Sequence, residues 1–213
     1  MPILACTLWC VRNWAIFYHG NVLDGTPCTN DPTNHDVCVG GICQPVGCDW
    51  ILYSDAEKDR CGVCDGNGNT CIKREMYFTE NRWLFGTKNP LQMVELKRGS
   101  SNIDAKKTAA TWNWIGVQNM MDEYLIKLPK YSKIIYKAGT KISYIHKTYQ
   151  FRDELIIPGP IQEGLQLVFV RNYESNHGVH ISYYEPVNST ETLSPQLFSW
   201  KVYEWSECSE NCG

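Results

Sequence analysis

Three cysteines, five residues apart, stand in the stretch Cys38-Val39-Gly40-Gly41-Ile42-Cys43-Gln44-Pro45-Val46-Gly47-Cys48. Glycine and proline interrupt regular secondary structure, so this stretch predicts a loop-rich region that depends on covalent crosslinks more than on an apolar core. The same composition continues on both sides of it. Nine of the 11 cysteines in the chain lie in its first third, at Cys6, Cys10, Cys28, Cys38, Cys43, Cys48, Cys61, Cys64 and Cys71.

We expect these nine cysteines to form disulfides, since a dense set of cysteines in a loop-rich segment is typical of secreted proteins. Nine is an odd number, so at least one of them lacks a partner within the segment. As an alternative, the C-x-x-C pair of Cys61 and Cys64 could belong to a zinc site or a redox motif. Neither His19 nor His35 completes a zinc ligand set, and the glycines around the pair predict a loop. We therefore predict no metal site and no cofactor in this chain.

The next segment, residues 72–199, contains no cysteine and changes to a period of two, in which apolar and polar side chains alternate. This period is typical of β-strands. In the strand predicted at 179–184, for example, Ile181 faces inward and His180 outward. The predicted strands are 93–97, 111–117, 124–128, 133–137, 142–149, 165–171 and 179–184.

Seven or more short strands, separated by glycine and proline turns and without a convincing helix, predict a mainly β protein. We expect a small disulfide-rich loop domain at 1–71 and an antiparallel β-sandwich of jelly-roll-like form at 72–199. Residues 200–213 are expected to begin a further module. Because Cys208 and Cys212 stand only four residues apart at the end, we also expect a fragment of a longer secreted protein.

Composition and motifs exclude several classes of function. The net charge of −3 argues against a strongly basic nucleic-acid binder. No apolar run approaches the roughly 18 residues that a membrane span requires. The sequence contains neither the H-E-x-x-H motif of zinc proteases nor a G-x-S-x-G nucleophile motif. We therefore predict no catalytic residues in this chain.

One window of the second segment is strongly basic, because no acidic residue lies between Glu123 and Asp153. Its seven cations are Lys127, Lys130, Lys133, Lys137, Lys141, Lys147 and Arg152. Several lysines on one surface attract sulfate groups in a salt-sensitive way, so we predict a sulfated glycosaminoglycan as ligand. The residues assigned to this site are Lys133, Lys137, Lys141, Lys147 and Arg152. The alternative is that these lysines only keep an exposed strand soluble.

Residues 37–49 read Val-Cys-Val-Gly-Gly-Ile-Cys-Gln-Pro-Val-Gly-Cys-Asp, and residues 59–66 read Asp-Arg-Cys-Gly-Val-Cys-Asp-Gly. Together they resemble the cysteine-rich domain of the ADAMTS proteins, secreted metalloproteinases with thrombospondin motifs. In that family a cysteine-free spacer domain with a β-sandwich fold follows, and residues 72–199 are similar to it in length and position. Residues 205–213, which read Trp-Ser-Glu-Cys-Ser-Glu-Asn-Cys-Gly, resemble the start of a thrombospondin type 1 repeat.

The resemblance implies a non-catalytic, secreted module that binds extracellular matrix proteins or proteoglycans, or recognises protein substrates. As an alternative, the chain is the exosite of an active zinc endopeptidase whose catalytic domain lies upstream of Met1. Zinc is expected only in that case, and neither nucleic acid nor membrane is an expected partner. The resemblance also implies mannosylation of Trp205. The sequon that begins at Asn188 predicts an N-linked glycan there. A spacer without any ligand is the third possibility.

Overall fold

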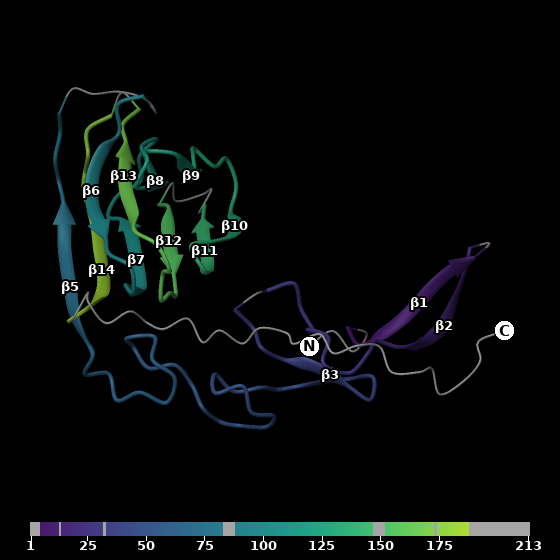
Figure 1. Cartoon of the computed structure of the whole chain (residues 1–213). Coiled ribbons are helices and arrows are strands. Elements are labelled where there is room, and N and C mark those ends of the chain that lie inside the picture. Colours follow the sequence, from purple (N-terminus) through teal and green to yellow (C-terminus); the bar gives the residue numbers. More distant parts are fainter. Residues whose placement is uncertain are drawn as a thin grey trace.

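The computed structural model describes residues 5–12, 14–31, 33–82, 88–146, 152–172 and 174–187. It shows a two-layered β-sandwich and, beside it, a loop-rich part from which a long hairpin extends (Figure 1). Every strand pair in these ranges is antiparallel, and none of the residues described is helical. The predicted mainly β, antiparallel fold class is thereby confirmed. No helix able to cross a membrane is found among these residues.

The sandwich consists of a six-stranded and a four-stranded sheet. In spatial order the larger sheet contains β10 (Lys133–Lys137), β11 (Thr140–Ile145), β12 (Glu154–Ile157), β7 (Ser101–Lys107), β14 (Val179–Pro186) and β5 (Cys71–Phe78). The smaller contains β6 (Leu91–Leu96), β13 (Leu165–Val170), β8 (Trp114–Asn119) and β9 (Tyr124–Ile126). Alternate side chains of both sheets point into one core, which excludes water completely at Ile103, Ile181 and Leu167. Across this core the rings of Phe78 and Phe169 lie 5.9 Å apart.

Most strands lie where the alternation of side chains predicted them. β10 has the predicted bounds, and β13 and β14 each differ from the prediction at one end only. Ile181 is buried and His180 is not, as expected. β11 covers the beginning of the strand predicted at 142–149, and residues 147–150 lie outside the described part of the chain. The sequence analysis missed β5, β7 and β12, because charged residues interrupt the apolar pattern of β5 and β7 and β12 is only four residues long.

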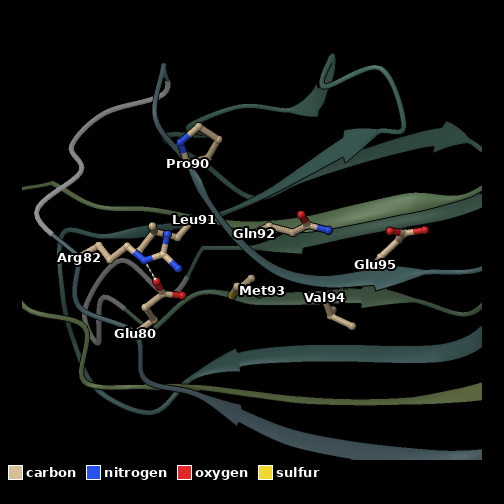
Figure 2. A pocket seen from close by; sticks show the side chains of 8 residues that line it. All are labelled: Glu80, Arg82, Pro90, Leu91, Gln92, Met93, Val94 and Glu95. Carbon is tan, nitrogen blue, oxygen red and sulfur yellow. Dashed lines mark ion pairs between the residues drawn. The ribbon is translucent and has the colours of Figure 1, made fainter.

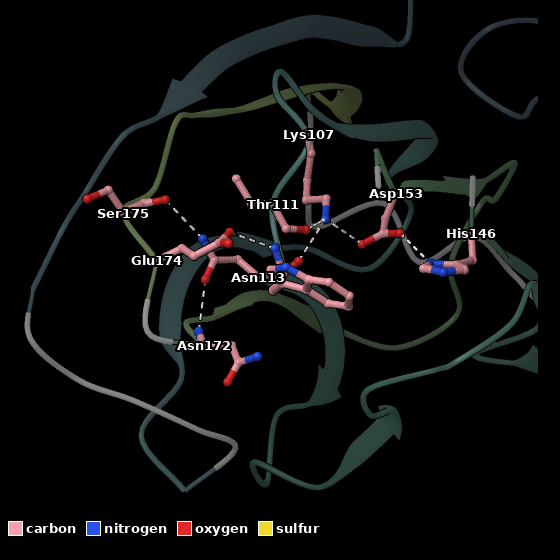
Figure 3. Close-up of polar contacts among 9 residues, drawn as sticks. Lys107, Thr111, Asn113, His146, Asp153, Asn172, Glu174 and Ser175 are labelled. Atoms are coloured by element: carbon pink, nitrogen blue, oxygen red, sulfur yellow. Dashed lines mark hydrogen bonds and ion pairs between the residues drawn. The ribbon is translucent and has the colours of Figure 1, made fainter. Parts of the chain in front are cut away.

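The strand predicted at 111–117 is wrong at its beginning, because β8 starts at Trp114. Residues 111–113 instead form a loop around the Lys107 ammonium group, which donates hydrogen bonds to the carbonyl oxygens of Thr111 (2.7 Å) and Asn113 (2.8 Å) (Figure 3). The same nitrogen lies 2.8 Å from the Asp153 carboxylate. The other carboxylate oxygen of Asp153 is 2.8 Å from Nδ1 of His146. A buried cation thus joins two loops, the β7–β8 and the β11–β12 connection, at one end of the sandwich.

This ion pair is almost dry. The Lys107 and Asp153 side chains are only 3% and 1% exposed. Burial disfavours the charged amine and lowers the pKa of Lys107 below its ordinary value, although the hydrogen bond and the charge of Asp153 act in the opposite direction. If one partner is removed from such a pair, the other charge remains in a low-dielectric environment without compensation.

We expect Lys107→Met to lower the free energy of unfolding by about 3–5 kcal/mol, because it leaves Asp153 without its cation. Chemical denaturation followed by tryptophan fluorescence measures this loss. The matched control is Lys106→Met, which removes an exposed lysine paired with Asp104 and Glu154 and should cost less than about 1 kcal/mol. Equal losses in the two variants would contradict the role assigned to the buried pair.

The loop-rich part contains a long hairpin, formed by β1 (Thr7–Arg12) with β2 (Ala15–Asn21), and a short one, formed by β3 (Val37–Val39) with β4 (Ile42–Gln44). Four disulfides hold it: Cys6–Cys38, Cys28–Cys43, Cys48–Cys64 and Cys61–Cys71. Its own cluster of buried residues consists of Cys6, Cys28 and Cys38. Crosslinks therefore replace most of the apolar core in this region, as a segment of this size requires.

Eight of the nine cysteines assigned to disulfides are thus paired. Cys10 differs: it is exposed on β1 and forms no disulfide with any described residue. The sulfur atoms of Cys6, Cys28 and Cys38 lie within 4.8 Å of one another, which is a spacing that thiolate ligands of a metal could adopt. Each of the three is part of a disulfide, however, so none is a free thiolate for zinc.

Contacts at one end of the sandwich join it to the loop-rich part. The Arg60 carbonyl oxygen accepts hydrogen bonds from the Ser101 hydroxyl (2.8 Å) and the Asn102 side-chain amide (2.9 Å). Gly62, with a φ of 81°, lies so close to Pro160 that a Cβ atom there would come within 2.7 Å of the proline ring. Only glycine suits this position, because both the backbone conformation and the space exclude a side chain. Small side chains and hydrogen bonds to the backbone therefore form this junction.

Reduction of the disulfides should unfold residues 5–71 and leave most of the sandwich folded, because the sandwich has its own apolar core and the loop-rich part has almost none. Each disulfide is expected to contribute about 2–4 kcal/mol. Hydrogen exchange with and without reducing agent, read separately for the two regions, measures the effect. A simultaneous loss of protection in both regions would contradict this division.

Candidate functional site

The basic window lies at one side of the sandwich, where β10 is the edge strand of the larger sheet. β10 and β11 form a hairpin in which Lys133 is opposite Tyr144 and Lys137 is opposite Thr140. Directly opposed residues of an antiparallel pair point to the same face. Tyr144 and Thr140 are buried, so Lys133 and Lys137 lie on the inner face of the sheet. They remain exposed because β10 is at its edge.

Lys141 lies on the other face, opposite Tyr136. The reason is the turn between the two strands, which has only two residues, Ala138 (φ 52°) and Gly139 (φ 69°). In a hairpin of this kind an odd-numbered residue pairs with an even-numbered one, so the odd-numbered Lys137 and Lys141 point to opposite faces. The structure thus brings Lys133 and Lys137 together and separates Lys141 from them.

Lys141 is also already paired. Its Nζ atom lies 3.5 Å from the carboxylate of Asp31 in the loop-rich part, so this ion pair adds to the junction between the two regions. Burial raises the pKa of Asp31, but hydrogen bonds from Thr33 and Tyr136 and the charge of Lys141 outweigh it and hold the pKa below its ordinary value. The carboxylate therefore stays charged at neutral pH.

Four further lysines of the basic window differ from Lys141 in this respect. Lys127 and Lys130 lie in the connection between β9 and β10, and all four of Lys127, Lys130, Lys133 and Lys137 are exposed. None of them forms an ion pair with another residue in the part of the chain described. Tyr131, at 78% exposure, stands among them. Lys127 and Lys130 belong to the basic window of the sequence but are not among the residues predicted for the site.

The other residues assigned to the site are less informative. Arg152 is exposed and precedes β12. Lys147 lies outside the described residues, as do the predicted glycosylation positions Asn188 and Trp205. Four lysines of the basic window are thus exposed without an acidic partner among the described residues: Lys127 and Lys130 between β9 and β10, and Lys133 and Lys137 on β10. We call these four the β10 lysine cluster.

The outer face of the larger sheet is also rich in charge, but its charges are paired with one another. Lys106 forms ion pairs with Asp104 and Glu154. Nε2 of His180 lies 2.7 Å from Glu75, whose pKa is lowered chiefly by this hydrogen bond. A surface whose cations already have acidic partners attracts an external anion weakly. The β10 lysine cluster therefore differs from the outer face in having no acidic partners among the described residues.

A groove of about 470 Å³ lies beside the edge strand β6 (Figure 2). Leu91 and Met93 are its buried apolar residues, and Gln92 and Glu95 are exposed along it. Glu80 and Arg82 form an ion pair at one end of the groove. The lining thus combines a short apolar surface with an internally paired charge. The residues that line the groove include no nucleophile paired with a general base.

The described residues thus combine a disulfide-linked, loop-rich part with a β-sandwich that contains no cysteine after Cys71. Residues 8–71 match the family model described as ADAMTS cysteine-rich domain. Residues 78–186 match the one described as ADAM-TS Spacer 1. The chain therefore belongs to the ADAMTS family, and both matched domains are of non-catalytic types.

Individual relatives give the same result. The chain is 34% identical over 214 residues to human "A disintegrin and metalloproteinase with thrombospondin motifs 6", in a match covering 97% of this chain and 18% of that protein. The mouse protein "A disintegrin and metalloproteinase with thrombospondin motifs 7" is 33% identical, in a match covering 90% of this chain and 11% of that protein. Mouse Papilin is 32% identical, with 98% and 16% covered. The chain spans less than a fifth of the length of these relatives.

The Asp31 contact generates a prediction about pH. A carboxyl group whose pKa is lowered by folding stabilises the folded state above its unfolded pKa of about 3.9, and this contribution is lost as the pH falls through the folded value. We therefore expect Asp31→Asn to lower the free energy of unfolding at pH 7 by about 1 kcal/mol or less.

As the pH falls below about 3.9 this difference should shrink, and it should disappear once the pH lies below the folded pKa, because the carboxyl group of the parent chain is then protonated in the folded state as well. Denaturant titrations of both proteins across this range measure it. Asp55→Asn, at an exposed position of the same part, is the control for the change in net charge. A stability difference that is independent of pH would contradict the assignment.

Proposed function

We propose that this chain is an extracellular recognition module of an ADAMTS or ADAMTS-like secreted protein, and that the β10 lysine cluster attaches it to sulfated glycosaminoglycan. The observation that carries this proposal is the set of four exposed lysines without an acidic partner among the described residues. Secretion is supported by the four disulfides, because such bonds persist in oxidising compartments.

The chemistry of the cluster suits a linear polyanion. Lysine ammonium groups are compact point charges that follow sulfate groups without demanding a fixed geometry. Lys133 and Lys137 stand four residues apart on one strand, and Lys127 and Lys130 precede them in the connection from β9. At about 3.3 Å per strand residue, Lys133 and Lys137 are roughly 13 Å apart, a spacing that an extended chain of sulfated sugars can bridge.

Recognition of a protein partner or substrate is the second part of the proposed function. Two of the relatives are named metalloproteinases. In such a protein a non-catalytic module can contribute by binding the substrate of the catalytic domain. The similarity to Papilin supports the interpretation as a matrix protein module equally well. In either case we propose no catalysis and no cofactor for this chain. Zinc would belong to a protease domain elsewhere in a longer protein.

Heparin chromatography of the intact chain tests the attachment. We expect Lys133→Ala/Lys137→Ala to elute at lower salt than the parent. The slope of log Kd against log salt should fall by about two, because each substituted lysine removes one ion pair with the polyanion. The matched control is Lys73→Ala/Lys106→Ala, which removes two lysines that have acidic partners in the same sandwich. If both double variants elute at the same salt, the attachment site is not the β10 lysine cluster.

A further inference from the structure

Four consecutive apolar residues are exposed on the loop-rich part. They are Trp50 (52% exposed), Ile51 (60%), Leu52 (44%) and Tyr53 (65%). We call Trp50–Tyr53 the Trp50 loop. An exposed apolar run of this length is unfavourable in water and raises aggregation risk, so it is kept in a folded protein only where it contributes to function.

The backbone of this loop is also strained. Trp50 has a φ of 65° and Tyr53 a φ of 60°. This left-handed region is uncommon for residues other than glycine, asparagine and aspartate, and it is unfavourable for a bulky side chain. Strain of this kind persists only where the surrounding structure fixes it, and it concentrates at functional sites. Two large aromatic side chains thus occupy positions where glycine would be more stable.

Several contacts hold the loop in this conformation. Asp49 accepts hydrogen bonds from the Ile51 amide (3.1 Å) and the Ser54 hydroxyl (2.6 Å), and the latter lowers the pKa of its carboxyl group. The Tyr53 amide donates to the Pro45 carbonyl oxygen (2.9 Å). The disulfide of Cys48 anchors the beginning of the loop. The aromatic side chains are therefore presented on a preorganised backbone, which reduces the entropy lost when a partner binds.

A hollow of about 370 Å³ adjoins the loop. Its lining residues are Thr33, Asn34, His35, Asp36, Val46, Cys48, Glu57 and Lys58. His35 connects the two features, since its ring stacks on Trp50 with the centroids 4.0 Å apart. Burial, together with the charge of Lys58, lowers the pKa of His35 and favours the neutral ring.

Two carboxylates, those of Asp36 and Glu57, and one ammonium group, that of Lys58, line the hollow, so its net charge is negative. The Asp36 carboxylate is engaged by the Val46 amide and the Asn34 side chain. The Glu57 carboxylate is exposed and has no hydrogen-bond or ion-pair partner among the described residues. Residues 1–71 as a whole contain three basic and eight acidic residues, a net charge of −5. A partner with a basic group is therefore favoured over an acidic one.

We infer that the Trp50 loop and the hollow beside it form a protein-docking site for a segment that carries apolar side chains together with a lysine or arginine. The apolar side chains pack on Trp50 and Tyr53, and the basic side chain enters the hollow toward Glu57. Tryptophan and tyrosine are the residues that most often dominate binding energy at protein interfaces. The inference deepens the protein-recognition part of the proposed function, and it is independent of glycosaminoglycan binding, which uses the opposite sign of charge on the other domain.

Selection of binders from a random peptide library against the intact chain tests this site. We expect the enriched peptides to combine leucine, isoleucine or aromatic residues with lysine or arginine. A synthetic peptide from this set serves as the probe, with its affinity measured by fluorescence anisotropy. Enrichment of acidic peptides, or of none, would overturn the inference.

Variants of the chain then locate the binding. Trp50→Gly and Tyr53→Gly should each weaken the affinity for the probe peptide by at least about tenfold, which is a loss of about 1.4 kcal/mol in binding free energy. Their melting temperatures should stay within a few degrees of the parent, because glycine relieves the left-handed strain. Glu57→Gln should weaken a lysine-containing probe but not the same probe with norleucine in place of lysine. Leu23→Ala, at a position 83% exposed, is the control that should change nothing.

Two further measurements distinguish a peptide segment from two other possible occupants of the Trp50 loop, a lipid surface and a second copy of the chain. Co-sedimentation with phosphatidylcholine vesicles that is lost in Trp50→Gly would assign the loop to a lipid surface and overturn the inference. Concentration-dependent self-association that is lost in the same variant would assign it to a second copy of the chain and overturn the inference as well. Heparin elution of every loop variant should equal that of the parent, so a failure of peptide binding is distinguishable from a failure of the β10 lysine cluster.

Discussion

The disulfide between Cys61 and Cys71 determines how the two parts of the molecule meet. Cys71 is the first residue of β5, and Cys61 follows directly after Arg60, whose carbonyl oxygen accepts the hydrogen bonds from Ser101 and Asn102. One covalent bond therefore fixes the edge of the sandwich and the loop that docks on its end. The hydrogen bonds alone are few and could not order a segment without a core. With the crosslink in place, they only have to select an orientation.

This arrangement also separates the charges of the chain. The loop-rich part is acidic and the sandwich carries the basic window, and at their junction Asp31 and Lys141 form an ion pair. Charges away from the junction remain available to ligands of opposite sign: the β10 lysine cluster for anions, Glu57 for cations. If both proposed sites bind their ligands, the two ligands would not compete, because they use separate surfaces of opposite charge.

The period of two was sufficient to predict the β class and most of the sandwich strands, because side-chain alternation and burial agree in strands such as β14. It failed at residues 111–113, where a distant cation recruits backbone carbonyl groups, an interaction without a local sequence pattern. The separation of Lys141 from Lys133 was predictable in principle. Once a two-residue turn is placed at Ala138 and Gly139, the numbering alone determines which face each lysine takes. The pairing of Lys141 with Asp31 was not predictable from the sequence, because the two residues are 110 positions apart.

The two ends of the sandwich are stabilised by different chemistry. At the junction end, crosslinks and small residues hold the loop-rich part, so its order depends on the redox state of the surroundings. At the opposite end, the ion pair of Lys107 and Asp153 holds loops that contain no cysteine, and this end is insensitive to redox conditions. β9, β10 and the connection that carries Lys127 and Lys130 contain no cysteine, whereas the Trp50 loop depends on Cys48. Loss of the disulfides would therefore remove the protein-docking site and leave the basic surface in place.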